Sequence, residues 1–397
     1  MTRHLPNAKL CHVSATRKSG VAALRVLSAA HFAEARSEIT QWAGYAATPL
    51  VMLAALARRI GVGEIYYKDE GPRFGLGSFK ALGGAYAAEQ VLRREVARRI
   101  GKDVSLADIR TGKYRAECAD ITLVSATDGN HGRSLAWGCQ RFGAPCWIYI
   151  HAEVSEGRAE AMRDLGAEVI RIDGDYDASL AQTKKEAEDN GWFVVSDTSW
   201  LGYSAPPLDV MAGYGVMTRE ICDALDRAPS HVFLQGGVGG LAAGVVAGFR
   251  QHWGDDAPRV IIVEPELAPC LFESAKAGAV TKVTVAEETL MAGLSCGEPS
   301  ELAWDILAEE AEDFLTIPES IVAPTVRLLA CPEEGDLAIE AGESGVAGLA
   351  ALIAARQDED LSAKLGLDAK ARILLIGSEG VTDPAIFTTI MEGQDAA

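Results

Sequence analysis

The chain has 397 residues, is 48% hydrophobic and carries a formal net charge of −19 at pH 7. This length and apolar content allow one large domain or two smaller ones around a substantial core, and the acidic balance argues against binding to nucleic acid or anionic membranes. No apolar stretch is long enough for a membrane span, and residues 1–20 contain no apolar signal core, so we expect a cytoplasmic protein.

Strand-like apolar runs alternate with Ala-rich helical patterns along the chain. This alternation predicts an α/β fold with open, twisted, mostly parallel sheets and flanking helices, in which ligands bind at the carboxyl ends of strands. We expect a smaller domain (86–204) inserted within a larger one (1–85 and 205–397). The predicted strands are EIYYKD, ITLVSAT, CWIYIH, AEVIRID, HVFLQGG, RVIIVEP and RILLIGSEG.

The first strand-end loop, GLGSFK, ends at Lys80. Ser78 suits a helix N-cap, which would place Lys80 in the first helical turn, where the helix dipole disfavours a positive charge. Burial and that dipole both favour the neutral amine, which is the nucleophilic form. The neighbours of Lys80 are Phe79 and Ala81 rather than Gly and Ser/Thr, so the loop is not a Walker motif.

The second loop, SATDGNHGR, follows the run ITLV. Its sharp turn can present backbone N–H groups to an anion, or it can be an ordinary connection between a strand and a helix. Asp128 could act as a base or acid, and Asn130 could orient a hydroxyl group.

The third loop, QGGVGGLAAG, contains Gly236, Gly237, Gly239 and Gly240. Glycines at this position let backbone amides approach a phosphate. Gly237-x-Gly239-x-x-Ala242 also matches a dinucleotide fingerprint, and Glu264 ends the next strand, where a ribose-binding acid would lie. Taken alone, this loop is compatible with a nicotinamide-dependent oxidoreductase.

Three further features lie later in the chain. Ser378 follows the last predicted strand, where it either caps a turn or binds a ligand. Asp197, Trp200 and Tyr203 lie in a proline-bounded segment that could close over a site, although the two aromatic rings could equally serve packing.

The eight cysteines form no CxxC motif and the seven histidines have no zinc-like spacing, so we expect neither a disulfide framework nor a metal site. Cys270 and Cys296 both follow turns that we place near the site entrance. A bond between them is conceivable, but cysteines of cytoplasmic proteins are usually reduced.

The loops together resemble the fold-type II pyridoxal phosphate enzymes, which include threonine and serine dehydratases and tryptophan synthase β. The closer resemblance, over nearly the whole chain, is to the diaminopropionate ammonia-lyase family. It is carried by KDEGPRFGLGSFKALGG, ATDGNHGRSLAW, SDTSWLGY, QGGVGGLAAG, IIVEP, MAGLSCGEP and GESGVAGL.

The resemblance implies pyridoxal 5'-phosphate as the cofactor and a role for each matching residue. Lys80 would form the Schiff base, Asn130 would contact the ring hydroxyl, and Ser378 would lie at the pyridine nitrogen. The phosphate would bind at Gly236, Gly237, Gly239 and Gly240. Asp128 and Asp197 would serve as base and as partner of the substrate amine, and further substrate contacts would come from Thr127, Trp200 and Tyr203.

The implied reaction is the α,β-elimination of D- or L-2,3-diaminopropionate to pyruvate and two ammonia molecules, by a homodimer acting on a small amino acid. Related dehydratases usually carry serine where this chain has Asp128, and a carboxylate is the better partner for an ammonium group. A dehydratase or deaminase of serine, threonine or another β-substituted amino acid is the first alternative. The oxidoreductase is the second, and it leaves Lys80 and Asn130 unexplained.

Overall fold

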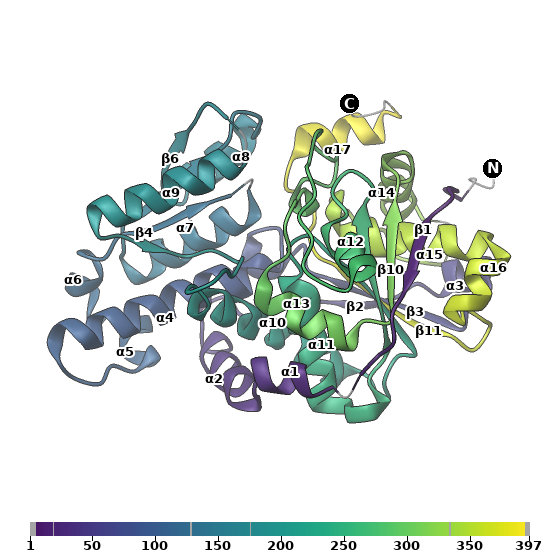
Figure 1. Ribbon diagram of the computed structural model, residues 1–397, viewed down its shortest axis with the longest axis horizontal. Helices are drawn as coiled ribbons and strands as arrows, with labels where there is room; N and C mark the ends of the chain where they lie inside the picture. Colours follow the sequence, from purple (N-terminus) through teal and green to yellow (C-terminus); the bar gives the residue numbers. More distant parts are fainter. Residues whose placement is uncertain (1–4, 19, 128, 175, 333–334, 394–397) are drawn as a thin grey trace. The chain divides into compact units, whose positions relative to one another are not determined.

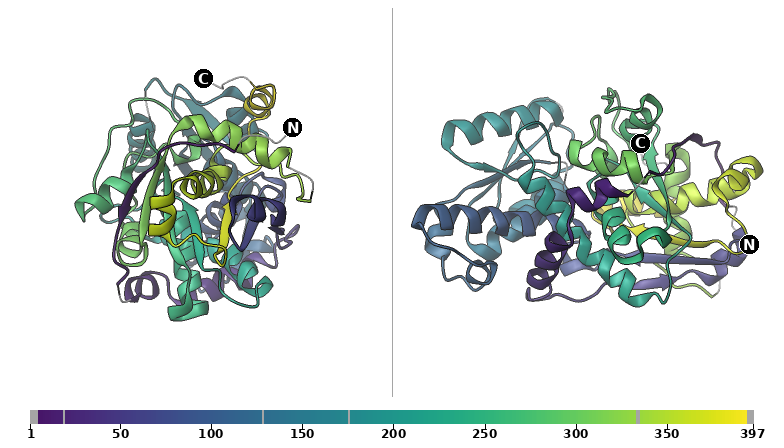
Figure 2. Two further views of the ribbon diagram at one scale, coloured as in Figure 1. Left: turned by 90° about the vertical axis from the view of Figure 1, so that its right-hand side faces the viewer. Right: turned by 60° about the horizontal axis from the view of Figure 1, so that its bottom comes forward.

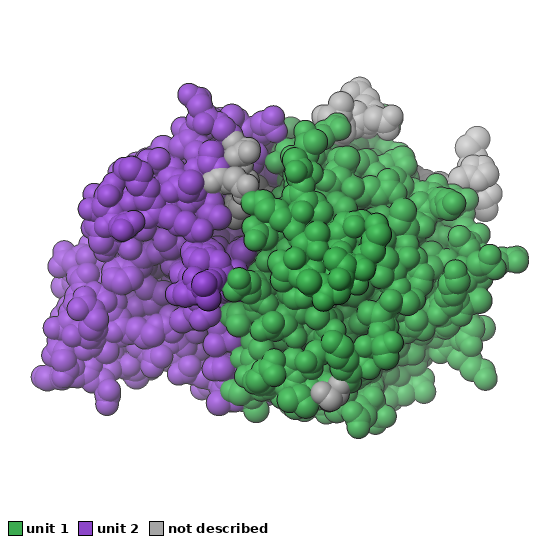
Figure 3. Space-filling view, viewed as in Figure 1, with its two compact units in different colours: residues 1–29, 47–78, 217–397 green, residues 30–46, 79–216 purple. Residues whose placement is uncertain are grey.

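The computed structural model describes residues 5–18, 20–127, 129–174, 176–332 and 335–393. The chain divides into two compact units, which Figure 3 shows in different colours. Unit 1 comprises Met1–Ala29, Ala47–Ser78 and Met217–Ala397, and unit 2 comprises Ala30–Ala46 and Phe79–Val216. The domain boundaries expected from the sequence, at 85/86 and 204/205, remain a prediction.

A seven-stranded sheet forms the centre of unit 1, in the order β1-β10-β9-β8-β11-β3-β2 (Figure 1). The five central strands are parallel, and β1 and β2 pair antiparallel at the two edges. Every residue of β8 and β11 is buried, which explains why both read as continuous apolar runs. The strands are β1 (Cys11–Ser14), β2 (Leu50–Met52), β3 (Glu64–Asp69), β8 (His231–Gln235), β9 (Arg259–Pro265), β10 (Asp313–Ile317) and β11 (Arg372–Gly377).

Helices pack on this sheet. The almost entirely buried α15 crosses β8, β9, β10 and β11, and it can be followed in both views of Figure 2 as a yellow-green helix beside the sheet. The α-helices are α1 (Val21–Val26), α3 (Ala54–Ile60), α11 (Gly240–Trp253), α12 (Cys270–Ala277), α13 (Glu301–Glu310), α14 (Val322–Ala330), α15 (Ala347–Gln357), α16 (Glu359–Leu365) and α17 (Pro384–Met391). Short 3-10 helices are η1 (Arg73–Gly75), η2 (Gly254–Asp256), η3 (Ala292–Leu294), η4 (Glu319–Ile321) and η5 (Ser344–Val346).

Unit 2 contains a parallel four-stranded sheet in the order β6-β5-β4-β7. Both α7 and α9 contact β4 and β5. The strands are β4 (Leu123–Ala126), β5 (Cys146–Ile150), β6 (Glu168–Arg171) and β7 (Phe193–Val194). The helices are α2 (Ala29–Ile39), α4 (Lys80–Ile100), α5 (Leu106–Arg110), α6 (Arg115–Cys118), α7 (Asn130–Phe142), α8 (Glu156–Arg163), α9 (Tyr176–Asn190) and α10 (Ala205–Ala224), of which α2 begins and α10 ends in unit 1.

The seven predicted strands are confirmed, whereas β1, β2, β7 and β10 were not predicted. Ser78 is not the N-cap of α4: the cap is Phe79, without a side-chain hydrogen bond, and Lys80 is the first helical residue. The proline-bounded segment becomes helical at Ala205, because prolines are tolerated in a first helical turn. Among the described residues, no helix is both long and apolar enough to cross a membrane.

A buried charge network in unit 1 holds the loop that leads to Lys80. The Arg73 guanidinium donates to both carboxylate oxygens of Glu70 and of Glu220, each at 2.8 Å. Lys68 Nζ donates to Glu220 Oε2 at 2.6 Å. The same loop keeps Phe74 in the left-handed region (φ 51°), which is strained for a residue other than glycine.

The network also determines how the Glu220 carboxyl titrates. Burial by itself would raise its pKa, but the hydrogen bonds and charges of Arg73 and Lys68 lower the pKa below its ordinary value. A lowered pKa in the folded state means that this contribution to stability is present at neutral pH and is lost as the pH falls through the folded-state pKa.

We predict that Arg73→Met lowers the free energy of unfolding by about 3–5 kcal/mol, because it removes the cation bound to the buried Glu70 carboxylate and one of the cations bound to Glu220. Urea-induced unfolding followed by circular dichroism measures the change. The matched control is Lys276→Met, which removes an exposed lysine paired with Glu273 in the same unit and should leave the midpoint unchanged. Equal midpoint shifts for the two variants would contradict a stabilising role of the network.

Candidate active site

In unit 2, β4 and β7 are parallel neighbours, so their carboxyl ends meet at the same edge of the sheet. Thr127, Asn130 and His131 follow β4, and Asp197 follows β7 closely. Asp128 lies outside the described residues. The Thr127 hydroxyl accepts hydrogen bonds from the backbone N–H groups of Gly129 (3.1 Å) and Gly132 (3.3 Å), so it shapes the turn before α7.

Lys80 and Asp197 are brought together although they lie 117 positions apart. The Lys80 ammonium donates a hydrogen bond to Asp197 Oδ2, and the two side chains are 19% and 15% exposed. Burial alone would raise the pKa of Asp197, but the charge of Lys80 and then that of His131 lower it well below its ordinary value. The carboxylate is therefore ionised across the physiological pH range.

The start of α4 is held against α7 through Ser134. Its hydroxyl donates to the Lys80 carbonyl at 2.6 Å and accepts from the Ala85 N–H at 3.0 Å. A Cβ at Gly84 would lie only 2.6 Å from Ser134 Oγ, and one at Gly138 would lie 2.8 Å from the Ala85 Cα. The small residues after Lys80 therefore allow the close approach of the two helices that fixes the backbone of this lysine.

Trp200 and Tyr203 stack at 4.1 Å between ring centroids, and Lys184 Nζ lies 3.8 Å from the centre of the Trp200 ring. The Tyr203 hydroxyl donates to the Val194 carbonyl at 2.9 Å and accepts from the Ser196 N–H at 2.9 Å. Tyr203 therefore ties the segment that carries Asp197 to the end of β7, which is a structural use of the ring.

In unit 1, the glycine loop joins β8 to α11. Gly237 and Gly239 have φ of 61° and 92°, and Gly239 is the N-cap of α11 without any side-chain cap. A Cβ at Gly236 would lie 2.4 Å from Glu264 Cγ. The first N–H groups of α11, Gly240 included, are thus left for an anion, and this geometry fits a phosphate group.

Glu264 is not placed to bind a ribose. Its fully buried carboxyl group accepts hydrogen bonds from the N–H groups of Leu271 (3.0 Å) and Phe272 (2.7 Å), and so it caps α12. Burial raises its pKa to about 8. The interpretation of the glycine loop as a dinucleotide-binding site therefore lacks the acidic residue that would bind the ribose.

Two cysteines lie close to the glycine loop. Cys270 Sγ is 3.4 Å from the Gly237 carbonyl oxygen. Cys270 is fully buried, whereas Cys296 is partly exposed, and their expected place near the site entrance remains a prediction. No disulfide joins the two thiols.

Ser378 follows β11, the parallel neighbour of β8, and is 4% exposed. Gln235, the last residue of β8, ties the two strand ends together: its Nε2 donates to the Ile376 carbonyl at 2.6 Å and to the Ser344 carbonyl at 3.2 Å. Sequence reasoning missed the roles of Gln235 and Ser134, because a long-range hydrogen bond leaves no local pattern.

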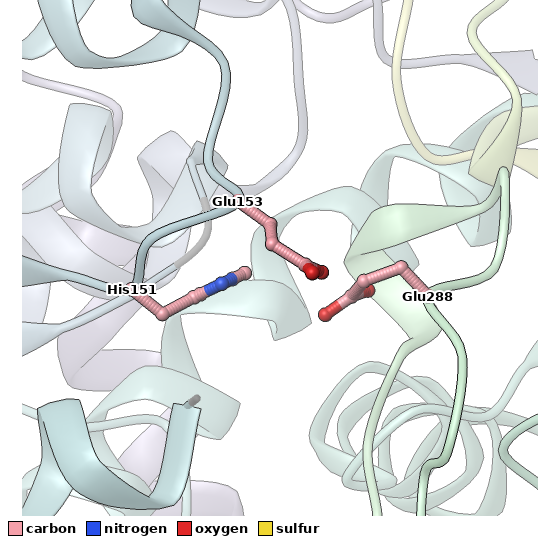
Figure 4. Close-up of side chains that lie close together, drawn as sticks. All are labelled: His151, Glu153 and Glu288. Carbon is pink, nitrogen blue, oxygen red and sulfur yellow. The ribbon is translucent and has the colours of Figure 1, made fainter. Parts of the chain in front are cut away.

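The predicted site residues thus form two sets. Unit 2 holds Lys80, Thr127, Asn130, Asp197, Trp200 and Tyr203, and unit 1 holds the glycine loop and Ser378. Figure 4 draws a separate group of His151, Glu153 and Glu288, of which the first two follow β5 in unit 2 and the third belongs to unit 1. We assign no metal site to this group.

The chain is similar to known proteins over most of its length. Residues 42–378 match the family described as "Pyridoxal-phosphate dependent enzyme". The chain is 38% identical over 365 residues to a diaminopropionate ammonia-lyase of Escherichia coli strain K12 (89% of both chains) and 37% identical over 357 residues to that of Salmonella typhimurium (87% of this chain, 88% of the relative).

A solved structure of the Escherichia coli enzyme, in complex with an aminoacrylate-PLP azomethine reaction intermediate, superposes with a TM-score of 0.89 at 34% identity. It covers 99% of this chain, and 100% of the solved chain is matched. The predicted fold-type II architecture is confirmed. The chain therefore belongs to the pyridoxal-phosphate dependent enzymes and, among them, to the diaminopropionate ammonia-lyase family.

Proposed function

We propose that this chain is a pyridoxal phosphate-dependent carbon-nitrogen lyase that converts 2,3-diaminopropionate, D or L, into pyruvate and two ammonia molecules. The observation that carries this proposal is the ionised Asp197 carboxylate beside Lys80, in a chain whose relatives at 37–38% identity are diaminopropionate ammonia-lyases.

The carboxylate matches a substrate whose β-substituent is an amine. A charge pair at about 4 Å is worth roughly 4 kcal/mol at an effective dielectric constant near 20, whereas a neutral hydrogen bond contributes only about 1 kcal/mol. Asp197 would therefore prefer a β-ammonium group over the hydroxyl of serine. Because the pKa of Asp197 is low, its carboxylate is ionised and retains this preference at neutral pH.

The resemblance implies that residues of this chain would hold the cofactor at four points. Lys80 would bond its aldehyde carbon and Asn130 its ring hydroxyl, while Ser378 would meet the pyridine nitrogen. The phosphate would lie in the loop of Gly236, Gly237, Gly239 and Gly240, where α11 has no side-chain cap. The N–H groups of Gly236 and Gly239 donate to the carbonyls of Val263 and Gly236, so the phosphate would be bound by the other N–H groups of this loop and by the first turn of α11. When bound, pyridoxal phosphate withdraws electrons from the Cα of the substrate. Ser378 offers a neutral hydroxyl, which gives the ring nitrogen no strong reason to carry a positive charge.

Each protein group then has one task in the elimination. Lys80 Nζ or Asp128 removes the Cα proton, according to the handedness of the substrate, and Asp197 holds the β-ammonium group. The electron pair of the Cα–H bond forms the new C=C bond, and the electron pair of the Cβ–N bond leaves with ammonia. Water hydrolyses the released enamine to pyruvate and the second ammonia. Thr127, Trp200 and Tyr203 would line the substrate site.

We further propose a cytoplasmic homodimer with domains 1–85/205–397 and 86–204. The described cysteines form no disulfide, which is typical of a reducing compartment, and the dimer follows from the family resemblance. Size-exclusion chromatography with light scattering measures the mass of the assembly, and limited proteolysis locates the domain borders.

The experiment that tests the function measures ammonia and pyruvate from each enantiomer of 2,3-diaminopropionate, using protein loaded with pyridoxal phosphate. We expect two ammonia molecules per pyruvate and little product from serine or threonine. Product from serine or threonine alone would favour a dehydratase instead.

Lys80→Ala should lower kcat at least ~100-fold, because it removes both the Schiff-base amine and a Cα base. Borohydride reduction followed by mass spectrometry should attach the cofactor to Lys80 in the wild type and nowhere in the variant. Full turnover by Lys80→Ala would refute the assigned role.

Asp197→Asn keeps the shape of the side chain and removes its charge. We expect kcat/KM to fall roughly 100-fold for diaminopropionate and much less for serine, since only the first substrate offers a cation. Steady-state kinetics with both substrates checks this difference. The same loss with both would show that Asp197 does not select the β-ammonium group.

Asp128→Asn should cost far more activity with one enantiomer of diaminopropionate than with the other, because a base acts on one face of Cα. Lys80, acting on the opposite face, would remain competent for the second enantiomer. Rates for the separate enantiomers provide the measurement, and equal retention of both activities would exclude Asp128 as a base.

A further inference from the structure

His131 connects the two strand-end loops of unit 2. Its side chain is only 4% exposed, and its Nε2 lies 2.9 Å from the Val195 carbonyl oxygen. A carbonyl oxygen only accepts hydrogen bonds, so Nε2 must carry a hydrogen. The titrating atom of this imidazole is therefore Nδ1.

Nδ1 of His131 faces the carboxylate of Asp197, at 4.0 Å from Oδ2. This is the same oxygen that receives the hydrogen bond from Lys80. The imidazole thus lies within ion-pair range of the group to which the proposed function assigns the β-ammonium of the substrate. The charge of His131 is also a cause of the low pKa of Asp197, second to that of Lys80 among the charges that lower it.

One carboxylate cannot fully compensate two cations at once in a site with little access to water. An imidazolium at His131 and an ammonium group of the substrate therefore compete for Asp197. We propose that His131 is a positioning residue that sets how much negative charge Asp197 offers, so that protonation of its imidazole weakens recognition of a cationic β-substituent. This inference rests on the proposed function and adds a residue that determines its specificity.

The direction of the effect follows from the competition. Below the pH at which the imidazole titrates, His131 is positive and the KM for diaminopropionate is high. Above it, His131 is neutral and no longer competes for Asp197, so the KM falls. Serine carries a neutral hydroxyl at the β-position, so its binding is not coupled to His131 in this way.

Other ionisable groups surround the pair. Lys80 comes from α4, Tyr203 from the segment that carries Asp197, and Tyr214 from α10. Burial raises the pKa of both tyrosine hydroxyls, so they stay neutral at physiological pH. Arg158 of α8 packs beside Gly129, just before α7.

The decisive variant is His131→Gln. Its amide N–H can replace the Nε2–H donor to Val195, but it cannot take up a proton. The matched control is His231→Gln, because His231 is also buried and its Nε2 bonds to the Leu365 carbonyl at 2.8 Å, in unit 1. Both variants are made as holoenzymes, and their unfolding temperatures are compared with that of the wild type.

The measurement is KM for diaminopropionate between about pH 6 and about pH 8, the range in which imidazoles titrate. For serine it is KM or, if turnover is slow, the inhibition constant. Dividing each wild-type value by the variant value at the same pH cancels the titrations of the substrates, of the cofactor and of Lys80.

For His131→Gln we expect this ratio to rise about tenfold toward low pH with diaminopropionate, which is a typical change for two coupled sites. With serine we expect the ratio to stay constant. For His231→Gln both ratios stay constant. A constant ratio for diaminopropionate with His131→Gln, or an equal rise with serine, overturns the inference. Absence of diaminopropionate turnover in the wild type would refute the proposed function instead, so the two failures are distinguishable.

A second measurement does not depend on the stability of His131→Gln. In protein labelled with 15N in the histidine rings, the imidazole of His131 should titrate at a lower pH in Asp197→Asn than in the wild type, because the facing carboxylate is lost. An identical titration in both proteins would show that the two side chains are not coupled.

Discussion

The contact between Lys80 and Asp197 is the interaction on which the candidate site of unit 2 depends. It joins the first residue of α4 to a segment 117 positions later, and the Asp197 carboxylate stays ionised although both side chains are largely buried. Such a pair persists only where the surrounding structure fixes both partners. Asp197 is placed by the parallel pairing of β4 and β7 and by the Tyr203 hydroxyl, and Lys80 by Ser134.

Unit 1 contains the second set of predicted site residues, at the glycine loop before α11. Its glycine loop leaves the first N–H groups of α11 available because no side chain caps the helix, and Glu264 fills the space behind Gly236. Gln235 fixes the end of β8 against the end of β11, from which Ser378 follows. The negative charge of a phosphate group thus suits the positive N-terminal end of α11. The positive charge of an ammonium group suits the Asp197 carboxylate of unit 2.

Much of the secondary structure could be predicted because its cause is local. Strands buried on both faces, such as β8 and β11, give long apolar runs, and glycines with positive φ mark the loops. The edge strand β1, the three-residue β2 and the two-residue β7 carry too little pattern to be recognised. Ser78 was expected to cap α4, but an N-cap requires a backbone geometry that the sequence does not fix, and Phe79 occupies that position.

The sequence by itself determined the α/β architecture, the strand-end loops and the residue types that they carry, because these features depend on short-range periodicity and turn chemistry. Only the tertiary structure decided which of those residues act together. Glu264 fits a ribose-binding acid by spacing, yet folding places its carboxylate on the N–H groups of Leu271 and Phe272. Asp197 has no fixed spacing from Lys80 or from His131. The pairing of β4 with β7 brings Asp197 to His131, and the packing of α4 on α7 brings Lys80 to Asp197, because strand order and helix packing, rather than distance along the chain, decide which side chains meet.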